Sequence, residues 1–244
     1  MSPRIYLATT GRILAQLRAD HRTVALIVAV PALLLTLLYF VFNDEQRFSP
    51  IALIMLGILP MLVMFLVTSV AMLRERTSGT LERLLTTPLH RADLVVGYAT
   101  AFAVAALVQG LVLVSVAHWG LGVETAGPLP WVLLVAVVGS VVGVATGLLA
   151  SAFARTEFQA VQFMPLFIGP QIFLCGLLAP RESMPELLQR VSDVLPMTYA
   201  VKGLQAVGSQ GDPTGDVLRN VAILALFAVG ALALAALSMP RQTR

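Results

Sequence analysis

Residues 75–91 read ERTSGTLERLLTTPLHR and separate two apolar runs, 50–73 and 94–117. A run of about 20 apolar residues crosses a hydrocarbon core about 30 Å thick, so each flanking run is long enough to span a membrane. The segment between them holds five charged residues, so it does not lie in hydrocarbon. Its pattern is too regular for a plain linker. We therefore expect a polytopic membrane protein with a short structured segment at one membrane face.

The composition of the whole chain supports this class. Of its 244 residues, 58% are hydrophobic and 12% are charged, whereas soluble domains carry about 25% charged residues. We predict an all-α membrane protein, a single domain over residues 1–244 with six transmembrane helices. The six spans are 23–42, 50–73, 94–117, 130–153, 158–179 and 221–239. Residues 1–22 lack the short apolar core of a cleavable signal peptide, and the single cysteine, Cys175, excludes an intrachain disulfide.

The basic residues predict the orientation of these spans. With both termini in the cytoplasm, eleven of the sixteen Lys and Arg residues lie inside, and eight of the thirteen Asp and Glu residues lie outside. Cytoplasmic loops carry an excess of Lys and Arg, so we reject the inverted topology. The formal net charge of +3 is then a topology signal and implies no nucleic-acid partner. Because the chain uses 15 arginines and one lysine, we infer a GC-rich bacterial genome and expect the bacterial cytoplasmic (plasma) membrane.

Residues 1–22 are amphipathic at helical spacing. Such a helix lies along a membrane surface with its basic groups toward anionic headgroups. The apolar side holds Tyr6, Ile13, Leu14 and Leu17, and the basic side holds Arg4, Arg18 and Arg22. The alternative is a short basic flank that only sets the topology.

Within 75–91 the pattern predicts a helix of about two turns. Gly79 can act as its N-cap, and Glu82 places a carboxylate near the helix N-terminus. Pro88 ends the helix. The apolar side consists of Leu81, Leu84 and Leu85. So short a helix is marginal alone in water, so it needs a partner surface, either its own bundle or another protein.

Residues 74–89 resemble the signature of ABC-2 type transporter permeases, the membrane subunits of ATP-binding-cassette exporters, and most closely the daunorubicin/doxorubicin-resistance group. That signature is roughly an acidic residue, Gly-Thr-Leu-Glu, two apolar positions and a proline. Tyr98 departs from the lysine that is common in the family a few residues later. The resemblance implies that 75–91 is a cytoplasmic coupling helix that docks on a separate ATPase. The matching residues are Glu75, Gly79, Thr80, Leu81, Glu82, Leu84, Leu85 and Pro88.

A second match covers residues 176–204. A Gly before a Pro, a Met-Pro pair and Leu-Pro-x-Thr-Tyr-Ala resemble the extracellular re-entrant region of the same family. The residues alone also predict a helical region over 180–204, because Ser183 and Glu186 fit a capping box. Met184, Leu187, Leu188 and Val191 fall on one helical side. Whether these outer helices are re-entrant or interfacial stays open at this point.

The chain shows no energy source of its own. A phosphate-binding loop needs Gly-x-x-x-x-Gly-Lys-Ser/Thr, and the one lysine, Lys202, lies in no such pattern. We therefore expect no enzyme activity, no cofactor and no metal site in this chain. ATP and Mg are expected on a partner ABC ATPase (nucleotide-binding) subunit. The resemblance also implies a second permease copy or homologue, and membrane lipids surround the bundle.

The fifth span, 158–179, is the most polar. Polar side chains in a membrane prefer the protein interior or a wet cavity, and prolines at 165 and 170 kink a helix and free backbone carbonyls. We expect this span near a substrate path; interhelical glutamine hydrogen bonds are the alternative. The candidate path residues are Gln159, Gln162, Phe163, Phe167 and Gln171.

The fourth span carries small residues four apart, which let two helices approach closely. They are Gly139, Gly143, Gly147 and Ser151. Packing inside one subunit is the favoured interpretation over pairing of two subunits.

The resemblance implies the permease subunit of an ATP-driven exporter that moves a hydrophobic drug, lipid or other amphiphile outward. A self-sufficient secondary transporter or channel is the first alternative, and it would show ionisable groups near the centres of its spans, which these spans lack. An integral membrane enzyme or assembly factor is the second, and the sequence shows no acid–base cluster for it.

Overall fold

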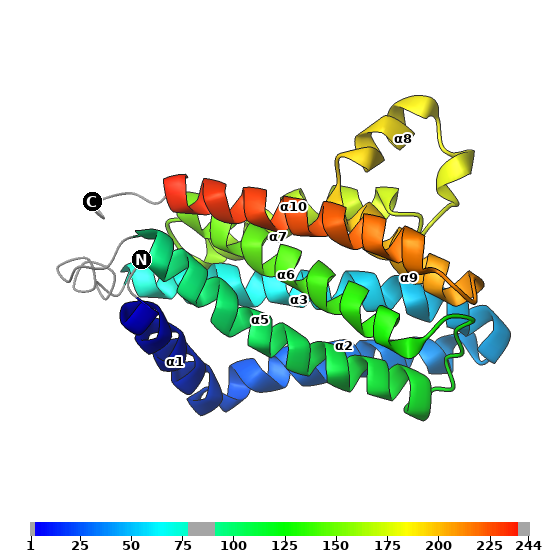
Figure 1. The fold of residues 1–244 in the computed structure, drawn as a ribbon, viewed down its shortest axis with the longest axis horizontal. Helices are drawn as coiled ribbons and strands as arrows, with labels where there is room; N and C mark the ends of the chain where they lie inside the picture. Colours follow the sequence, from blue (N-terminus) through cyan, green and yellow to red (C-terminus); the bar gives the residue numbers. More distant parts are fainter. Residues whose placement is uncertain (1–2, 78–90, 239–244) are drawn as a thin grey trace.

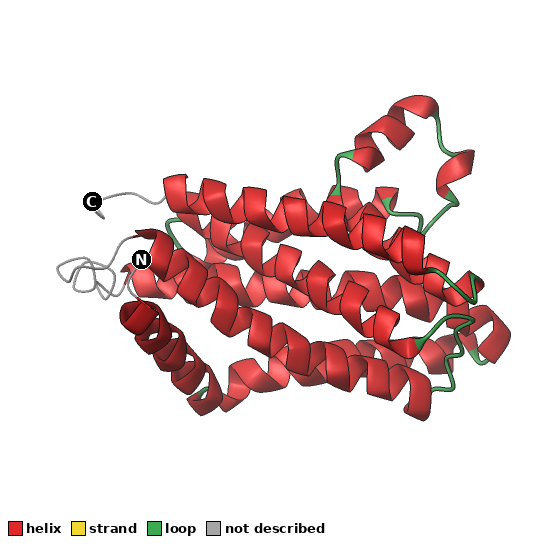
Figure 2. Ribbon diagram, in the orientation of Figure 1, coloured by secondary structure: helices red, strands yellow, loops and turns green. Residues whose placement is uncertain are grey.

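The computed structural model describes residues 3–77 and 91–238. Over those residues the chain forms helices joined by short loops, with no strand (Figure 2). In chain order the elements are α1 (Pro3–Ala19), α2 (His21–Phe42), α3 (Glu45–Thr77), α5 (Arg91–Ser115), the π-helical turn η1 (Val116–Gly120), α6 (Leu129–Phe153), α7 (Glu157–Leu174), the 3₁₀ turn η2 (Arg181–Ser183), α8 (Glu186–Asp193), α9 (Pro196–Ser209) and α10 (Thr214–Ser238). The all-α prediction is confirmed for this part of the chain.

Five helices of the described chain are long and apolar enough to cross a membrane. They are His21–Phe42, Arg47–Thr77, Asp93–Gly120, Leu129–Phe153 and Thr214–Ser238. The remaining predicted span, the fifth, corresponds to α7, which has 18 residues and includes one glutamate, three glutamines and two prolines. It is less apolar for that reason, and the six-span plan stays a prediction at this position.

The predicted end of the fifth span at residue 179 is wrong. α7 ends at Leu174, capped by Cys175. Gly176 follows with φ +101°, a left-handed conformation that glycine adopts without a Cβ penalty. The apolar composition of 175–179 made this stretch resemble a helix, but the backbone turns out of the bundle there.

α3 and α6 form the centre of the bundle (Figure 1). A Cβ atom at Gly143 would collide with the carbonyl oxygen of Met61, and one at Gly147 would collide with the Phe65 carbonyl. The small residues of α6 therefore bring its backbone directly against α3. This confirms the interpretation of the stripe as close packing within one subunit.

α2 and α10 lie at the periphery and bury only one narrow side each. In α2 the buried residues are Ile27, Pro31 and Leu35. In α10 they are Val217, Asn220, Leu224, Ala228, Ala231 and Ala235. Both helices expose large apolar side chains, such as Phe40 and Leu226. Contiguous apolar surface of this extent marks contact with lipid or another subunit.

Pro31 has no amide hydrogen to give to the carbonyl of Ile27, which lies four residues earlier. The buried side chain of Gln109 in α5 replaces that donor: its Nε2 lies 2.8 Å from the Ile27 oxygen. This polar contact joins the first and third predicted spans.

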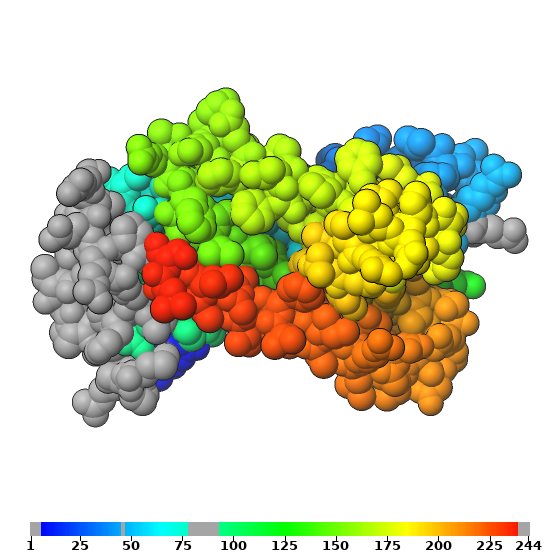
Figure 3. Space-filling view, turned by 90° about the horizontal axis from the view of Figure 1, so that it is seen from above, coloured from blue at the N-terminus to red at the C-terminus, as the bar shows by residue number. Residues whose placement is uncertain are grey.

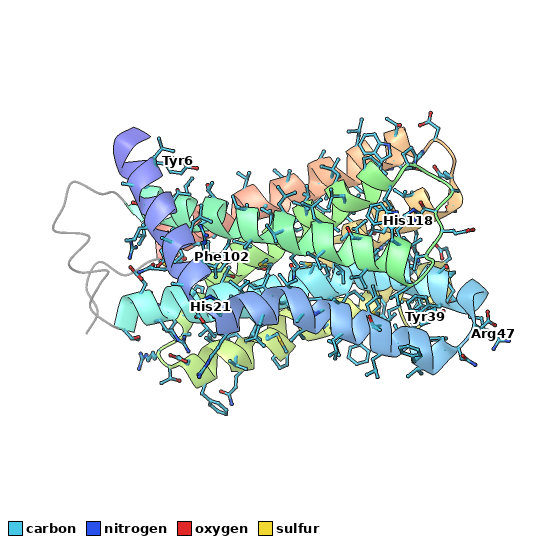
Figure 4. All side chains as sticks on the ribbon, turned by 90° about the horizontal axis from the view of Figure 1, so that it is seen from below. Tyr6, His21, Tyr39, Arg47, Phe102 and His118 are labelled. Atoms are coloured by element: carbon cyan, nitrogen blue, oxygen red, sulfur yellow. The ribbon has the colours of Figure 1, made fainter. Side chains whose placement is uncertain are left out.

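α1 lies obliquely across the end of the bundle at which α3 ends and α5 begins, and α10 ends there too (Figure 1). Ile13 is buried, and Leu14 and Leu17 pack on the same apolar cluster as α5. The Tyr6 hydroxyl donates to Thr100 Oγ1 at 2.8 Å. Figure 4 places Tyr6, His21 and Phe102 toward this end, and Tyr39, Arg47 and His118 toward the other. The helix is confirmed, and its predicted apolar side packs on the chain's own bundle.

At the opposite end the chain returns into the bundle through α9. Met197 and Ala200, in its first turns, pack with Met61, Phe65 and Val142, which lie near the midpoints of α3 and α6. α9 then runs outward to Ser209. α8 stands away from the bundle at this level (Figure 1).

The predicted capping box of α8 is wrong. Pro185 is the N-cap, with no side-chain cap. The Ser183 hydroxyl donates instead to the carbonyl of Pro180 at 2.6 Å, within its own 3₁₀ turn. Met184 has extended backbone between the two turns. Because Pro185 fixes the start of the helix one residue before Glu186, Ser183 is too far upstream to cap it.

Candidate functional site

Most of the predicted coupling segment lies outside the described residues. Its helix and its docking role stay predictions. The residues concerned are Gly79, Thr80, Leu81, Glu82, Leu84, Leu85 and Pro88.

Glu75, the first residue of the coupling motif, lies in the last turn of α3 and is buried. Its Oε1 accepts a hydrogen bond from Arg12 Nη1 of α1 at 2.8 Å. Tyr98 of α5 is also buried, and it lines the same cavity as Glu75, which is described below. In this structure the carboxylate therefore binds α1 of its own chain.

Arg74, the residue before it, forms an ion pair with Glu157 at the start of α7. Arg74 Nε lies 2.8 Å from Glu157 Oε1, and Nη2 lies 3.1 Å from Oε2. This two-point contact fixes the relative orientation of the planar groups. The two side chains are 59% and 53% exposed.

Arg76, the residue after Glu75, is buried. Its Nη1 donates to the carbonyl oxygens of Ser151 and Ala154, the latter at 3.4 Å. These carbonyls end α6, where a cation is favoured by the helix dipole and by the unpaired acceptors.

The end of α3 is thus bonded to three different helices through three consecutive side chains. Arg74 binds α7, Glu75 binds α1 and Arg76 binds α6. We name Arg74–Arg76 the charged triplet. Of the three residues, only Glu75 was a predicted site residue. The only sequence signal of the two arginines is charge at the end of an apolar run, since their partners lie 75 to 83 residues away in sequence.

A cavity of about 440 Å³ lies over α3 at this end, with α1, α2 and α5 on one side and Val161 of α7 on the other. We call it the inner groove. It is apolar over most of its lining and polar at the end that holds Asp20, Arg74 and Glu75. The lining residues are Ile13, Gln16, Leu17, Asp20, Thr23, Leu26, Leu66, Val67, Val70, Ala71, Arg74, Glu75, Tyr98, Phe102 and Val161.

Asp20 keeps a negative charge at the mouth of the inner groove. Hydrogen bonds from the hydroxyl and the amide of Thr23 lower the pKa of its carboxyl group. Its Oδ2 lies 2.6 Å from Thr23 Oγ1, and its Oδ1 lies 3.1 Å from the Thr23 nitrogen. The same bonds make Asp20 the N-cap of α2.

A second cavity, of about 500 Å³, lies over α6 between α7, α9 and α10. We call it the lateral groove. Figure 3 looks down on this face: α7 and α10 flank it, and α8 lies toward its outer end. Its lining is mostly apolar and consists of Thr146, Leu149, Leu166, Phe167, Pro170, Gln171, Leu195, Pro196, Leu226, Phe227, Gly230, Ala231 and Leu234.

The five predicted path residues are not gathered around one cavity. Phe167 and Gln171 line the lateral groove, and Gln162 is exposed. Gln159 Oε1 accepts from the Arg155 amide at 2.8 Å, just before α7 begins. Phe163 packs edge-on against Phe167, with ring centroids 6.3 Å apart.

Gln171 makes the interhelical hydrogen bond that was the alternative for this span. It is buried, and its Oε1 accepts from the Met197 amide of α9 at 3.2 Å. Its Nε2 donates to the Phe167 carbonyl at 2.7 Å. The amide thus holds the start of α9 against α7.

This bundle of long apolar helices, with apolar surface on its periphery and grooves between its helices, defines a multi-pass membrane protein. The family model of the "ABC-2 type transporter" matches residues 4–207. The chain therefore belongs to the ABC-2 type transporter family.

Curated relatives of known source are similar over part of their length. The linearmycin resistance permease protein LnrN of Bacillus subtilis is 31% identical over 157 residues, 64% of this chain and 40% of LnrN. The probable multidrug ABC transporter permease YbhR of Escherichia coli is 31% identical over 134 residues, 55% of this chain and 36% of YbhR. The inner membrane transport permease YhhJ of Escherichia coli is 30% identical over 164 residues, which are 67% of this chain and 43% of YhhJ. The chain thus spans about two fifths of the length of these relatives.

Proposed function

We propose that this chain is the membrane-embedded permease subunit of an ATP-driven exporter. It works with a separate ABC ATPase, which binds ATP and Mg, and with a second permease copy or homologue. The observation that carries the proposal is the family match over residues 4–207. The chain itself performs no catalysis.

Six spans with both termini in the cytoplasm are the proposed topology, in a bacterial cytoplasmic membrane. The distribution of arginines supports it. α7 is the fifth span of this topology: it packs along α3, and the ring centroids of Phe167 and Phe65 lie 5.9 Å apart. α1 lies at the cytoplasmic interface.

α9 is re-entrant in this proposal. Its first turn packs near the midpoints of α3 and α6, and its last residue is at the outer end of the bundle. A flat interfacial helix would make no contact at that depth. α8, whose Leu187, Leu188 and Val191 are exposed, lies at the outer membrane surface.

The substrate class is a hydrophobic drug, lipid or other amphiphile. The inner groove supports this class, because apolar walls suit a tail and the charged end suits a polar headgroup. The names of two relatives refer to linearmycin resistance and to multidrug transport. Both grooves are single-subunit surfaces, and a second copy would enclose a path along them.

Coupling to the ATPase is assigned to residues 75–88, which include a short docked helix. Gly79 and Thr80 set its start, and Glu82 makes a polar contact to the ATPase. Leu81, Leu84 and Leu85 fill the groove of the ATPase, and Pro88 ends the helix. Glu75 joins this helix to the bundle.

The test is co-purification from a native host. The tagged chain is solubilised gently, and the bound proteins are identified for wild type, Leu84→Asp and Leu187→Asp. Leu187 is exposed on α8, so Leu187→Asp makes the same chemical change far from the coupling segment. We expect an ABC ATPase with wild type and with Leu187→Asp, and its loss with Leu84→Asp.

Two results would overturn the proposal. One is a well-folded preparation in which no sample contains an ATPase. The other is export by the purified chain alone in proteoliposomes without ATP, which would establish a self-sufficient transporter or channel. Substrate turnover by the purified chain would instead establish a membrane enzyme.

A further inference from the structure

We propose that Arg74 and Glu157 form a breakable latch across the cytoplasmic end of the inner groove, which joins α7 to α3 when closed. This inference rests on the proposed function, because a latch acts only in a protein that changes conformation during transport. It assigns a positioning role to two residues outside the predicted site.

The geometry places the ion pair across the groove. Arg74 lines the inner groove on α3, and its partner Glu157 is the first residue of α7. Val161, one helical turn after Glu157, lines the same groove. Separation of Arg74 from Glu157 would therefore let the start of α7 move away from α3 and widen the groove at this end.

The contact is local to this end of the helix. Further along, Phe167 of α7 packs on Phe65 of α3, and Gln171 is bonded to α9. α7 is thus held at its outer half by packing and by a buried hydrogen bond. At its cytoplasmic end the paired charges act together with buried Ala160, which lies in one apolar cluster with Leu73 of α3. Loss of the charge pair would weaken the hold on that end and favour a tilt of α7 about its outer half.

Exposure distinguishes this pair from its two neighbours. The Arg74 and Glu157 side chains are 59% and 53% exposed, so water compensates both charges when they separate. Glu75, in contrast, is only 10% exposed, and Arg76 is buried on the last carbonyls of α6. Buried charges lose more when their partners are removed. α1, α3 and α6 therefore stay joined, and the contact between the ends of α3 and α7 is the weakest of the three charged contacts.

The position of the charged triplet in sequence connects the latch to the ATPase. Thr77 is the last residue of α3, and the predicted docking segment begins two residues later. A displacement of that segment reaches Arg74 through one turn of helix. The ATPase would thus act on the latch through the end of α3.

The experiment measures the width of the inner groove directly. Spin labels are placed at Leu26→Cys on α2 and Val161→Cys on α7, both partly exposed positions that line the groove, in a Cys175→Ser background. Distances are measured by pulsed electron paramagnetic resonance in the permease–ATPase complex in lipid nanodiscs, without nucleotide and after trapping with ADP and vanadate. The variants are Arg74→Glu, Glu157→Arg and the double charge reversal.

We expect the wild-type distribution to change on nucleotide trapping. Each single reversal should shift the distribution to longer distances under both conditions, because like charges then face each other. The double reversal should restore the wild-type distribution. The control reverses the exposed pair Glu186–Arg190 on α8, which is far from the groove and should leave the distances unchanged.

Three outcomes would overturn the latch while leaving the proposed function intact. One is a wild-type distribution in both single reversals. Another is a failure of the double reversal to restore the shift. The third is a wild-type distance that does not respond to nucleotide in a complex that contains the ATPase. A pair with only a structural role would lower the unfolding midpoint of the single variants without moving the distances.

Discussion

The side-chain amide of Gln109 occupies the place of the hydrogen-bond donor that Pro31 removes from α2, at 2.8 Å from the carbonyl oxygen of Ile27. In hydrocarbon no water can take over this role, so the bond depends on the protein alone. Two residues that look unrelated in sequence, a proline in the first span and a glutamine in the third, thus compensate each other.

The first prediction concerns this pair. Gln109→Leu should lower the free energy of unfolding by about 1 kcal/mol, because it leaves a carbonyl without a donor. Pro31→Ala restores the backbone donor, so the same leucine should cost much less in that background. The coupling energy is obtained by unfolding four proteins in mixed micelles: wild type, Gln109→Leu, Pro31→Ala and the double variant. Equal costs of Gln109→Leu in both backgrounds would contradict the compensation.

The close approach of α6 and α3 gives the second prediction. Gly143→Ala puts a Cβ against the Met61 backbone, which cannot move aside as a flexible side chain can. We expect destabilisation of about 2 kcal/mol, in the range of overpacked cores. Gly230→Ala on α10 is the matched control, because nothing lies within 4 Å of its Cβ position. Equal thermal stability of the two variants would contradict the packing described here.

The third prediction concerns how the stability that Asp20 contributes changes with pH. Its pKa is lowered in the folded protein, chiefly by the Thr23 side-chain hydrogen bond. A lowered pKa means that the cap stabilises the fold above the unfolded-state pKa and that this contribution is lost as the pH falls through the folded-state pKa. Asp20→Ala should cost about 1 kcal/mol at neutral pH.

Asp20→Asn provides the control for that measurement. Asparagine still caps the helix but does not titrate. The difference in unfolding midpoint between wild type and Asp20→Asn should therefore shift against wild type on acidification from neutral pH. A difference that is constant across the acid range would show that the carboxyl group of Asp20 does not contribute through its charge.

The fourth prediction concerns Arg76. Arg76→Met keeps the length of the side chain but removes the donor for the last carbonyls of α6, and we expect a loss of about 2 kcal/mol of stability, as for hydrogen bonds to a charged group. Arg190→Met, at an exposed position on α8, should change stability by well under 0.5 kcal/mol. Chemical unfolding of both variants tests the contrast. Similar losses of stability would show that the buried hydrogen bonds of Arg76 do not stabilise the fold more than an exposed arginine does.

The sequence predicted the helices well and the contacts between them poorly. Runs of apolar residues predicted the first four spans to within four residues and the sixth to within seven, because length and hydrophobicity decide insertion in a membrane. The glycine stripe of α6 was also interpreted correctly, since a row of small residues on one helix side lets a neighbouring backbone approach closely.

The failures have a common physical origin in tertiary contacts and local backbone geometry. Glu75 pairs with Arg12 across 63 residues, and Arg74 pairs with Glu157 across 83, distances at which a single sequence carries no pairing signal. The false capping box at Ser183 arose because Pro185 moves the helix start. The end of α7 was missed because Gly176 turns the chain within an apolar stretch.

The narrow contact surface of α2 affects when this helix gains its partners while the protein is being synthesised. A chain is synthesised from its N-terminus, so α2 is made before α5. The Ile27 carbonyl then waits without its partner until Gln109, 82 residues later, has entered the bilayer. α2 therefore reaches its final environment only after α5 has joined it, and a nascent chain stalled before residue 109 would carry a loosely held helix open to capture by membrane chaperones.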